Sequence, residues 1–154
     1  DEAIQTLLAN DRFQMTTRRL AQAMDVSKAP KVLQDKAAEM FPKAETSIKA
    51  AYEAGVKIAV GTDAPAIPHG RNADELVTLV EWGMPPAAVL RAATTVAADL
   101  INVTDRGRLA EGQLADIIAV PGDPLADITV TQHVNFVMKG GKVFKNECAE
   151  ANPN

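Results

Sequence analysis

Asp63 is the residue of this chain whose type and position best suit chemistry. It comes directly after an apolar run at residues 56–60 and a short Gly-Thr step, and the loop that continues from it carries His69 and Asn72. In α/β folds, ligands bind where loops converge beyond the carboxyl ends of the strands. A carboxylate at that place can bind a metal ion and can also accept a proton from water on that ion.

An ordinary structural role for the same residues stays open. Aspartate is among the side chains preferred for capping helices and turns, so Asp63 could simply accept hydrogen bonds from backbone amides of its own loop. His69 is equally compatible with a surface position in that loop. Residue spacing by itself favours neither interpretation.

The residues before Asp63 predict a helix followed by a strand. Apolar side chains recur every three or four positions over residues 31–54, which predicts an amphipathic helix ended by Gly55. Pro42 lies inside this stretch and predicts a kink or two abutting helices. The β-branched apolar run at residues 56–60 is typical of a buried parallel strand.

Two further helices are predicted after the loop of residues 61–72. The first begins near Asn72, whose spacing from Glu75 resembles a capping box, and it ends at Gly83. The second runs over residues 85–101 and opens with two prolines, which suit a first helical turn. Helix, strand, loop and helix in this order indicate α/β architecture.

The two ends of the chain differ in pattern. Residues 1–10 predict a short helix, and residues 13–16 are compatible with a strand or a helix. The C-terminal third is expected to consist mostly of strands, with Gly140-Gly141 as a hairpin turn. The predicted strands are residues 116–120, 134–138 and 142–145.

Composition and charge restrict the kinds of partner. The 154 residues are 47% hydrophobic and 23% charged, which is typical of one soluble globular unit. The net charge of -4 comes from dispersed charges without a basic stripe, so no nucleic acid is expected. No apolar run reaches the roughly 18 residues of a membrane helix, so no membrane is expected. The single Cys148 leaves the compartment open, either cytoplasm or export after removal of a leader.

Four sequence features together resemble the amidohydrolase superfamily. The resemblance extends from about Ala44 to Lys145 and is closest to the branch of metal-dependent hydrolases that holds Xaa-Pro dipeptidases and imidazolonepropionase-like enzymes. The features are Gly61-Thr62-Asp63, Pro68-His69-Gly70 with Asn72, the stretch GMPPAAVLRAAT at residues 83–94, and GRLAEGQLADI at residues 107–117.

The resemblance implies the C-terminal part of a (β/α)8 TIM-type barrel together with strands of a small β-sandwich built from both chain ends. On this reading, residues 1–105 belong to the barrel, residues 106–145 to the sandwich, and residues 146–154 form a polar tail. Residues 56–60 become the eighth barrel strand. A complete barrel usually takes about 250 residues, so the chain is expected to be a portion of one.

The resemblance also implies roles for individual residues. Asp63 becomes both a metal ligand and the catalytic base, and His69 and Asn72 become substrate-binding residues. The implied cofactor is zinc, as one or two divalent ions in the complete enzyme. His69 and His133 are the two histidines of the chain, and neither matches the family's histidine ligands. Zinc needs three or four protein ligands, so this chain alone is expected to lack most of them.

Two functions remain as candidates. The first is the C-terminal portion of a metal-dependent amidohydrolase that cleaves an amide bond of a small substrate, such as an Xaa-Pro dipeptide, by metal-activated hydroxide. The alternative is a non-catalytic α/β module stabilised by association with another chain. Half a barrel exposes strand edges and apolar surface, so we expect a homo-oligomer or association with the missing N-terminal half.

Overall fold

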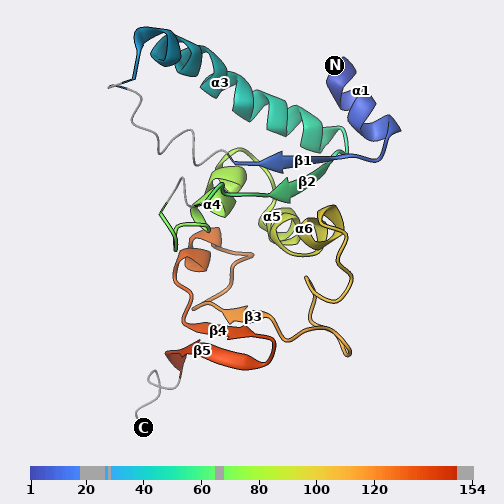
Figure 1. The fold of residues 1–154 in the computed structure, drawn as a ribbon, viewed down its shortest axis with the longest axis vertical. Helices are drawn as coiled ribbons and strands as arrows, with labels where there is room; N and C mark the ends of the chain where they lie inside the picture. The colour runs from blue at the N-terminus through green and yellow to red at the C-terminus, as the bar shows by residue number, and fades with distance from the viewer. Residues whose placement is uncertain (18–26, 28, 65–67, 149–154) are drawn as a thin grey trace.

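Two sheets and the helices around them organise the described part of the chain (Figure 1). The computed structural model describes residues 1–17, 27, 29–64 and 68–148. The helices are α1 (Glu2–Ala9), α3 (Lys31–Glu53), α4 (Asp74–Glu81), α5 (Pro86–Ala93) and α6 (Thr95–Leu100), with a 3-10 helix η2 (Ile128–Gln132). The strands are β1 (Phe13–Thr16), β2 (Lys57–Val60), β3 (Ile117–Ala119), β4 (Phe136–Lys139) and β5 (Lys142–Asn146).

The first sheet is a parallel pair, β1 and β2. Phe13 lies opposite Lys57 and Thr16 lies opposite Val60. Residues 13–16 therefore form a strand, which settles the choice that their sequence left open. Parallel neighbours need a long crossover, and the chain between them contains α3. The carboxyl ends of both strands consequently lie at the same edge of the sheet.

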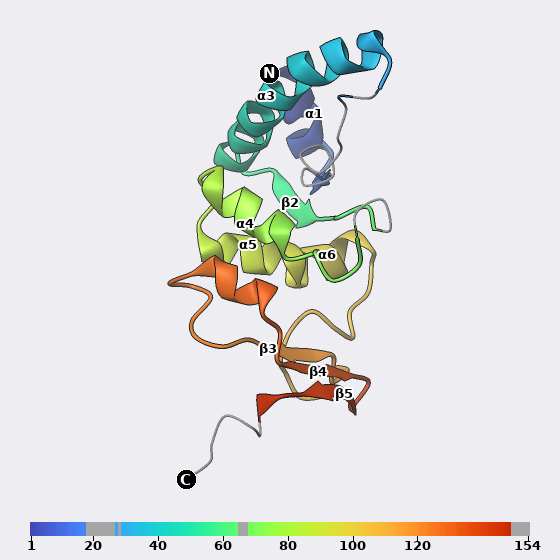
Figure 2. The same ribbon diagram turned by 90° about the vertical axis from the view of Figure 1, so that its left-hand side faces the viewer.

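Helix α3 runs into β2 through a glycine. It is one continuous helix that includes Pro42, and Figure 2 shows its axis bending along its length. The predicted alternative of two abutting helices is therefore wrong. Gly55 has a φ of 89°, a left-handed value that suits glycine. The amides of Gly55 and Val56 then donate to the carbonyls of Tyr52 and Ala51, at 2.9 and 3.0 Å, and end the helix.

The core forms where β2 lies between α3 on one side and α5 and α6 on the other (Figure 1). Ile58 is 4% exposed and Ala59 is fully buried, so the prediction of a buried parallel strand is confirmed. Side chains from α1, α3 and α4 complete this core. Its buried apolar members are Ile48, Ala51, Val56, Ile58, Leu79, Met84, Ala88 and Val89.

The predicted capping box at the start of α4 was wrong. The helix begins at Asp74, and no side chain caps it. Asn72 contributes its backbone carbonyl instead, which accepts from the amide of Glu75 at 3.3 Å. The Glu75 side chain is fully buried. It therefore points away from the exposed turn before the helix, where a capping box would need it to accept a hydrogen bond from a backbone amide.

The single helix predicted over residues 85–101 was also wrong, because it breaks into α5 and α6. The break lies at Thr94, whose backbone has φ -125° and ψ -90°. Its hydroxyl donates to the carbonyl of Leu90 at 2.7 Å, which competes with helical hydrogen bonding. Gly107 packs so closely here that a Cβ on it would lie 3.0 Å from the Thr94 carbonyl oxygen. The break thus lies where Gly107 packs against Thr94.

The second sheet is antiparallel, in the order β3-β4-β5. Gly140 and Gly141, at φ 55° and 79°, form the predicted two-residue hairpin turn. Asp116 reinforces it, since its carboxylate accepts from the Gly140 amide at 2.7 Å. Strand β4 begins at Phe136, two residues later than predicted, and β5 continues to Asn146, one residue further than predicted.

The described residues contain two parallel strands and so do not close a barrel by themselves. None of the helices within the described ranges is long and apolar enough to cross a membrane. Residues 149–154 of the predicted polar tail lie outside the described part. The division at residues 105 and 145 stays a prediction.

Candidate functional site

The candidate site begins at the carboxyl end of β2, where Gly61 holds the chain close to β1. The Gly61 amide donates to the carbonyl of Thr16 at 2.8 Å, one step beyond the paired strands. A Cβ at this position would lie 2.9 Å from the Thr16 oxygen and 3.0 Å from Cγ of Met15. Only glycine fits this approach without displacing β1, so the start of the loop is fixed against the sheet.

Asp63 follows in a conformation that is uncommon for a residue with a side chain. Its φ is 55°. Aspartate tolerates this left-handed region better than most residues, and such outliers concentrate at ligand-binding and catalytic sites. The side chain is exposed and makes no hydrogen bond or ion pair within the part of the chain that is described. Both carboxylate oxygens are therefore open to a ligand.

A cavity of about 750 Å³ lies beside this loop. Gly61, Thr62, Gly70 and Asn72 are among its lining residues, and the others come from the end of β2, from Ala73, Thr94 and Val134 and from α4, α5, η2 and the three-stranded sheet. Asn72 thus lies at the cavity. Asp63 and His69 are exposed neighbours of lining residues and do not line it themselves. The structure places all three on one loop, and their roles stay predictions.

The donor set that the described residues offer is smaller than a zinc site requires. Within the described ranges, no group of three or more His, Cys, Asp or Glu side chains lies close enough together to hold a metal ion. Zinc in proteins takes three or four such ligands. Asp63 could supply one of them, so these residues fit part of a metal site and not a whole one.

Two buried acids at the start of α4 were missed by the sequence interpretation. Asp74 is 6% exposed and Glu75 is fully buried. The signal was present, because residues 74, 75, 78 and 79 share one face of a helix, and Leu79 identifies that face as the buried one. Reading Glu75 as a capping residue concealed it.

Asp74 joins two distant segments through its carboxylate. Oδ1 accepts from Nε2 of Gln132 in η2 at 2.8 Å. Oδ2 lies 2.7 Å from Nη2 of Arg71, in the loop that carries His69 and Asn72. The acid therefore connects the candidate loop with the C-terminal part of the chain.

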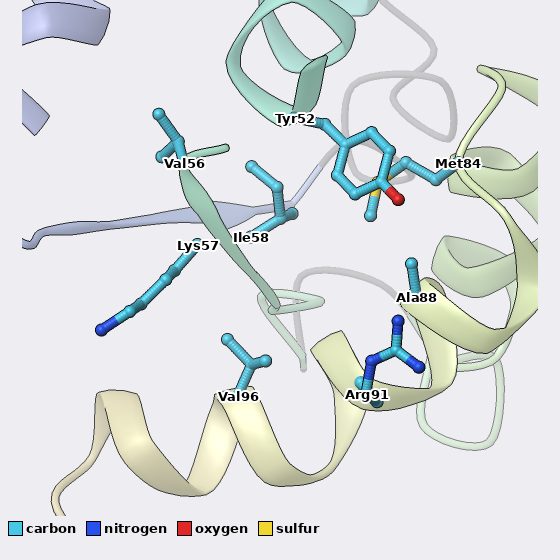
Figure 3. A pocket seen from close by; sticks show the side chains of 8 residues that line it. All are labelled: Tyr52, Val56, Lys57, Ile58, Met84, Ala88, Arg91 and Val96. Carbon is cyan, nitrogen blue, oxygen red and sulfur yellow. The ribbon is translucent and has the colours of Figure 1, made fainter. Parts of the chain in front are cut away.

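A second cavity, of about 160 Å³, lies near the amino end of β2 (Figure 3). Tyr52 extends toward it from the end of α3 and Arg91 from α5, whereas Lys57 points away. Its other lining residues are Val56, Ile58, Met84, Ala88 and Val96. This cavity lies toward the opposite end of the strand from Asp63, so it is separate from the candidate site.

The fold and the site define a class before any comparison is made: an α/β protein with a cavity at the carboxyl end of a buried parallel strand. The sequence profile of the Amidohydrolase family matches residues 6–144. The chain belongs to the amidohydrolase family, as its motifs predicted.

Individual relatives agree with this assignment. The ochratoxinase of Aspergillus niger is 37% identical over 140 residues, which cover 85% of this chain and 29% of the relative. The structure of a Xaa-Pro dipeptidase with bound methionine in the active site matches with a TM-score of 0.87 and 36% identity, over 94% of this chain and 37% of that one. The A. niger ochratoxinase structure matches with a TM-score of 0.82 and 33% identity, over 96% and 35%. The matched part of the chain thus spans between 29% and 37% of the length of these relatives.

Proposed function

We propose that this chain is the C-terminal portion of a metal-dependent amidohydrolase that hydrolyses an amide bond in a small substrate, such as an Xaa-Pro dipeptide. The observation that carries the proposal is the position of Asp63, three residues beyond β2 and next to the lining of the large cavity. The similarity to a Xaa-Pro dipeptidase and to an ochratoxinase supports the choice of substrate.

The size and lining of the cavity suit such a substrate. Pockets for small molecules usually measure about 300–1,000 Å³ and combine apolar walls with a few polar groups. Here Leu76, Leu90 and Ile118 contribute apolar surface, and Asn72 and Gln132 contribute amides. An apolar side chain such as a prolyl ring would pack on Leu76, Leu90 and Ile118. The amide group of Asn72 would donate to a substrate oxygen.

In this mechanism Asp63 has two tasks. It would hold a divalent ion, expected to be zinc, together with ligands that the described residues do not supply. When bound, the ion supplies Lewis-acid polarisation of the scissile carbonyl and a water that is acidic near neutral pH. Asp63 accepts the proton from the attacking water and passes it to the leaving nitrogen. His69, exposed on the same loop, assists substrate binding.

Replacement of Asp63 by asparagine tests the proposal. We expect Asp63→Asn, in the protein expressed with all of its natural sequence, to lower kcat by about two to four orders of magnitude, the range for a positioned acid or base. Asparagine also tolerates a positive φ, so the backbone turn is kept and the charge is the main change. Hydrolysis of a panel of Xaa-Pro dipeptides provides the measurement.

The matched control is Asp99→Asn, which removes an exposed carboxylate from α6. It should leave turnover within about twofold of the parent, because surface substitutions outside special features have small effects. Activity of Asp63→Asn within a few-fold of the parent would end the assignment of the base.

A non-catalytic module held by another chain is the second candidate. The exposure of Val143 and Phe144 in the edge strand β5 favours it, because large apolar side chains exposed at a sheet edge suit contact with another chain. Metal analysis combined with the hydrolysis assay separates the two functions. Stoichiometric metal together with amide hydrolysis contradicts the module, and an inert oligomer supports it.

A further inference from the structure

We propose that Asp74 is a positioning residue that fixes the spacing between the loop bearing Asn72 and the 3-10 helix η2, two segments that both line the large cavity. The contacts of Asp74 with the loop and with η2 do not depend on any catalytic activity. Only their effect on substrate binding rests on the proposed function. Asn72 and Gln132 both line the cavity, although 60 positions separate them in the sequence.

The contacts of Asp74 carry the argument. Its side chain is 8% exposed, and its two oxygens address different segments. Oδ1 accepts from Nε2 of Gln132 at 2.8 Å, and Oδ2 lies 2.7 Å from Nη2 of Arg71. Arg71 immediately precedes Asn72. One carboxylate therefore touches both the loop and η2.

Burial makes this link strong. An ion pair between two exposed side chains contributes little, because water and salt screen it. A buried carboxylate that loses a partner pays a desolvation cost that the native structure had compensated. Arg71 and Gln132 are themselves exposed, so the buried end of each of these two contacts is the Asp74 carboxylate. Losing either contact therefore loosens the segment to which the partner belongs.

The 3-10 helix is ordered enough to transmit this restraint. Ile128 and Thr131 are 5% and 6% exposed and anchor η2 against the rest of the chain. Asp127 accepts from the amide and the hydroxyl of Thr129 at 2.9 and 2.7 Å, and the Thr131 hydroxyl donates to the Ile128 carbonyl at 2.7 Å. Gln132 extends from the end of this helix to Asp74, so η2 can restrain the loop through it.

Proteolysis at Arg71 tests the link without any assay of activity. Trypsin needs an extended local backbone, so the rate of cleavage after the exposed Arg71 should follow the population of open loop when reclosing is fast. We expect Asp74→Asn, in the protein expressed with all of its natural sequence, to be cleaved at the Arg71–Asn72 bond about five- to thirtyfold faster, measured by mass spectrometry of that peptide. Glu39→Gln removes the exposed Glu39–Lys43 pair and should not change this rate.

A second variant keeps the test valid if Asp74→Asn fails to fold. Gln132→Met changes an exposed residue and removes the donor to Asp74 at nearly constant length. It should speed cleavage at Arg71 about two- to tenfold, the factor expected for one lost hydrogen bond. Asparagine at position 74 still offers an oxygen to Gln132, so the double variant combines Gln132→Met with Asp74→Leu, which removes both carboxylate oxygens. It should match Asp74→Leu within about twofold, because Gln132 acts through Asp74.

Two results would overturn the proposal: cleavage at Arg71 unchanged in Gln132→Met, or a further acceleration of more than about twofold when Gln132→Met is added to Asp74→Leu. If a substitution only destabilised the whole fold, trypsin would cleave at other lysines and arginines faster by the same factor. In the proposed enzyme, Asp74→Asn should raise KM about tenfold and change kcat by less than about threefold, because Asn72 moves and Asp63 does not. A lower kcat at unchanged KM would contradict this, whereas failure of the Asp63 assignment leaves the proteolysis result intact.

Discussion

Two isoleucines at comparable places show how differently the two sheets are built. Ile58 lies within β2 and is 4% exposed, whereas Ile118 is the middle residue of β3 and is 59% exposed. Helices cover β2 from both sides (Figures 1 and 2), whereas Ile118 lines the large cavity, which leaves its side chain open to water. Two similar isoleucines in apolar strands are thus buried to very different extents, because helices pack on one strand and a cavity borders the other.

The difference separates a region whose central strand is buried by its own helices from one in which no strand residue is buried. The β2 region forms a core from residues of α1, α3, α4 and α5. No residue of β3, β4 or β5 is buried in the described structure, although Val143 and Phe144 are apolar. The relatives are nearly three times as long as the part that this chain matches. We therefore propose that another layer covers the three-stranded sheet in the whole protein.

Truncation of the two isoleucines should give the largest contrast. Ile58→Ala is expected to lower the free energy of unfolding of the 154-residue chain by about 2–5 kcal/mol, because it leaves a cavity in the core. Ile118→Ala should change it by less than about 0.5 kcal/mol, since the side chain remains largely in water. Urea denaturation followed by circular dichroism gives both values. Equal losses would show that β3 is as well covered as β2.

Two glycines test the same comparison through the backbone. Gly61→Ala should cost about 1–3 kcal/mol, because the new methyl group meets β1. Gly141→Ala meets nothing within 4 Å and pays only for its φ of 79°, roughly 1 kcal/mol. In amide NMR spectra, the first change should move the signals of Met15 and Thr16, and the second should move only those of the hairpin. Unchanged β1 signals in Gly61→Ala would refute the close approach.

The smallest effect concerns pH and the start of η2. Hydrogen bonds from the hydroxyl and the amide of Thr129 lower the pKa of Asp127 below its ordinary value of 3.8. A lowered folded-state pKa means that the ionised acid stabilises the fold above the ordinary value, and that this contribution disappears as the pH falls through the lower folded value. The Thr129 amide shift should therefore titrate with a midpoint below 3.8, and Asp127→Asn should abolish this titration. A midpoint above 3.8 would contradict the capping role.

Several elements followed from local sequence. The three- and four-residue spacing over residues 31–54 predicted α3, and the β-branched run before Gly61 predicted β2. Gly140-Gly141 predicted the hairpin. The motif around Asp63, taken with the other family features, predicted the family that the comparison then showed. Each of these signals depends on residues close together in the chain, which is why the sequence alone determined them.

Only the tertiary structure decided the rest. Residues 13–16 became a strand because β2 was available to pair with them, and the helix after Pro85 broke where Gly107 packs on Thr94. The burial of Asp74 followed from its contact with Gln132, and the cavity formed from segments between residues 60 and 145. These outcomes depend on contacts between segments far apart in sequence, and such contacts leave no periodic signal in the residues that make them.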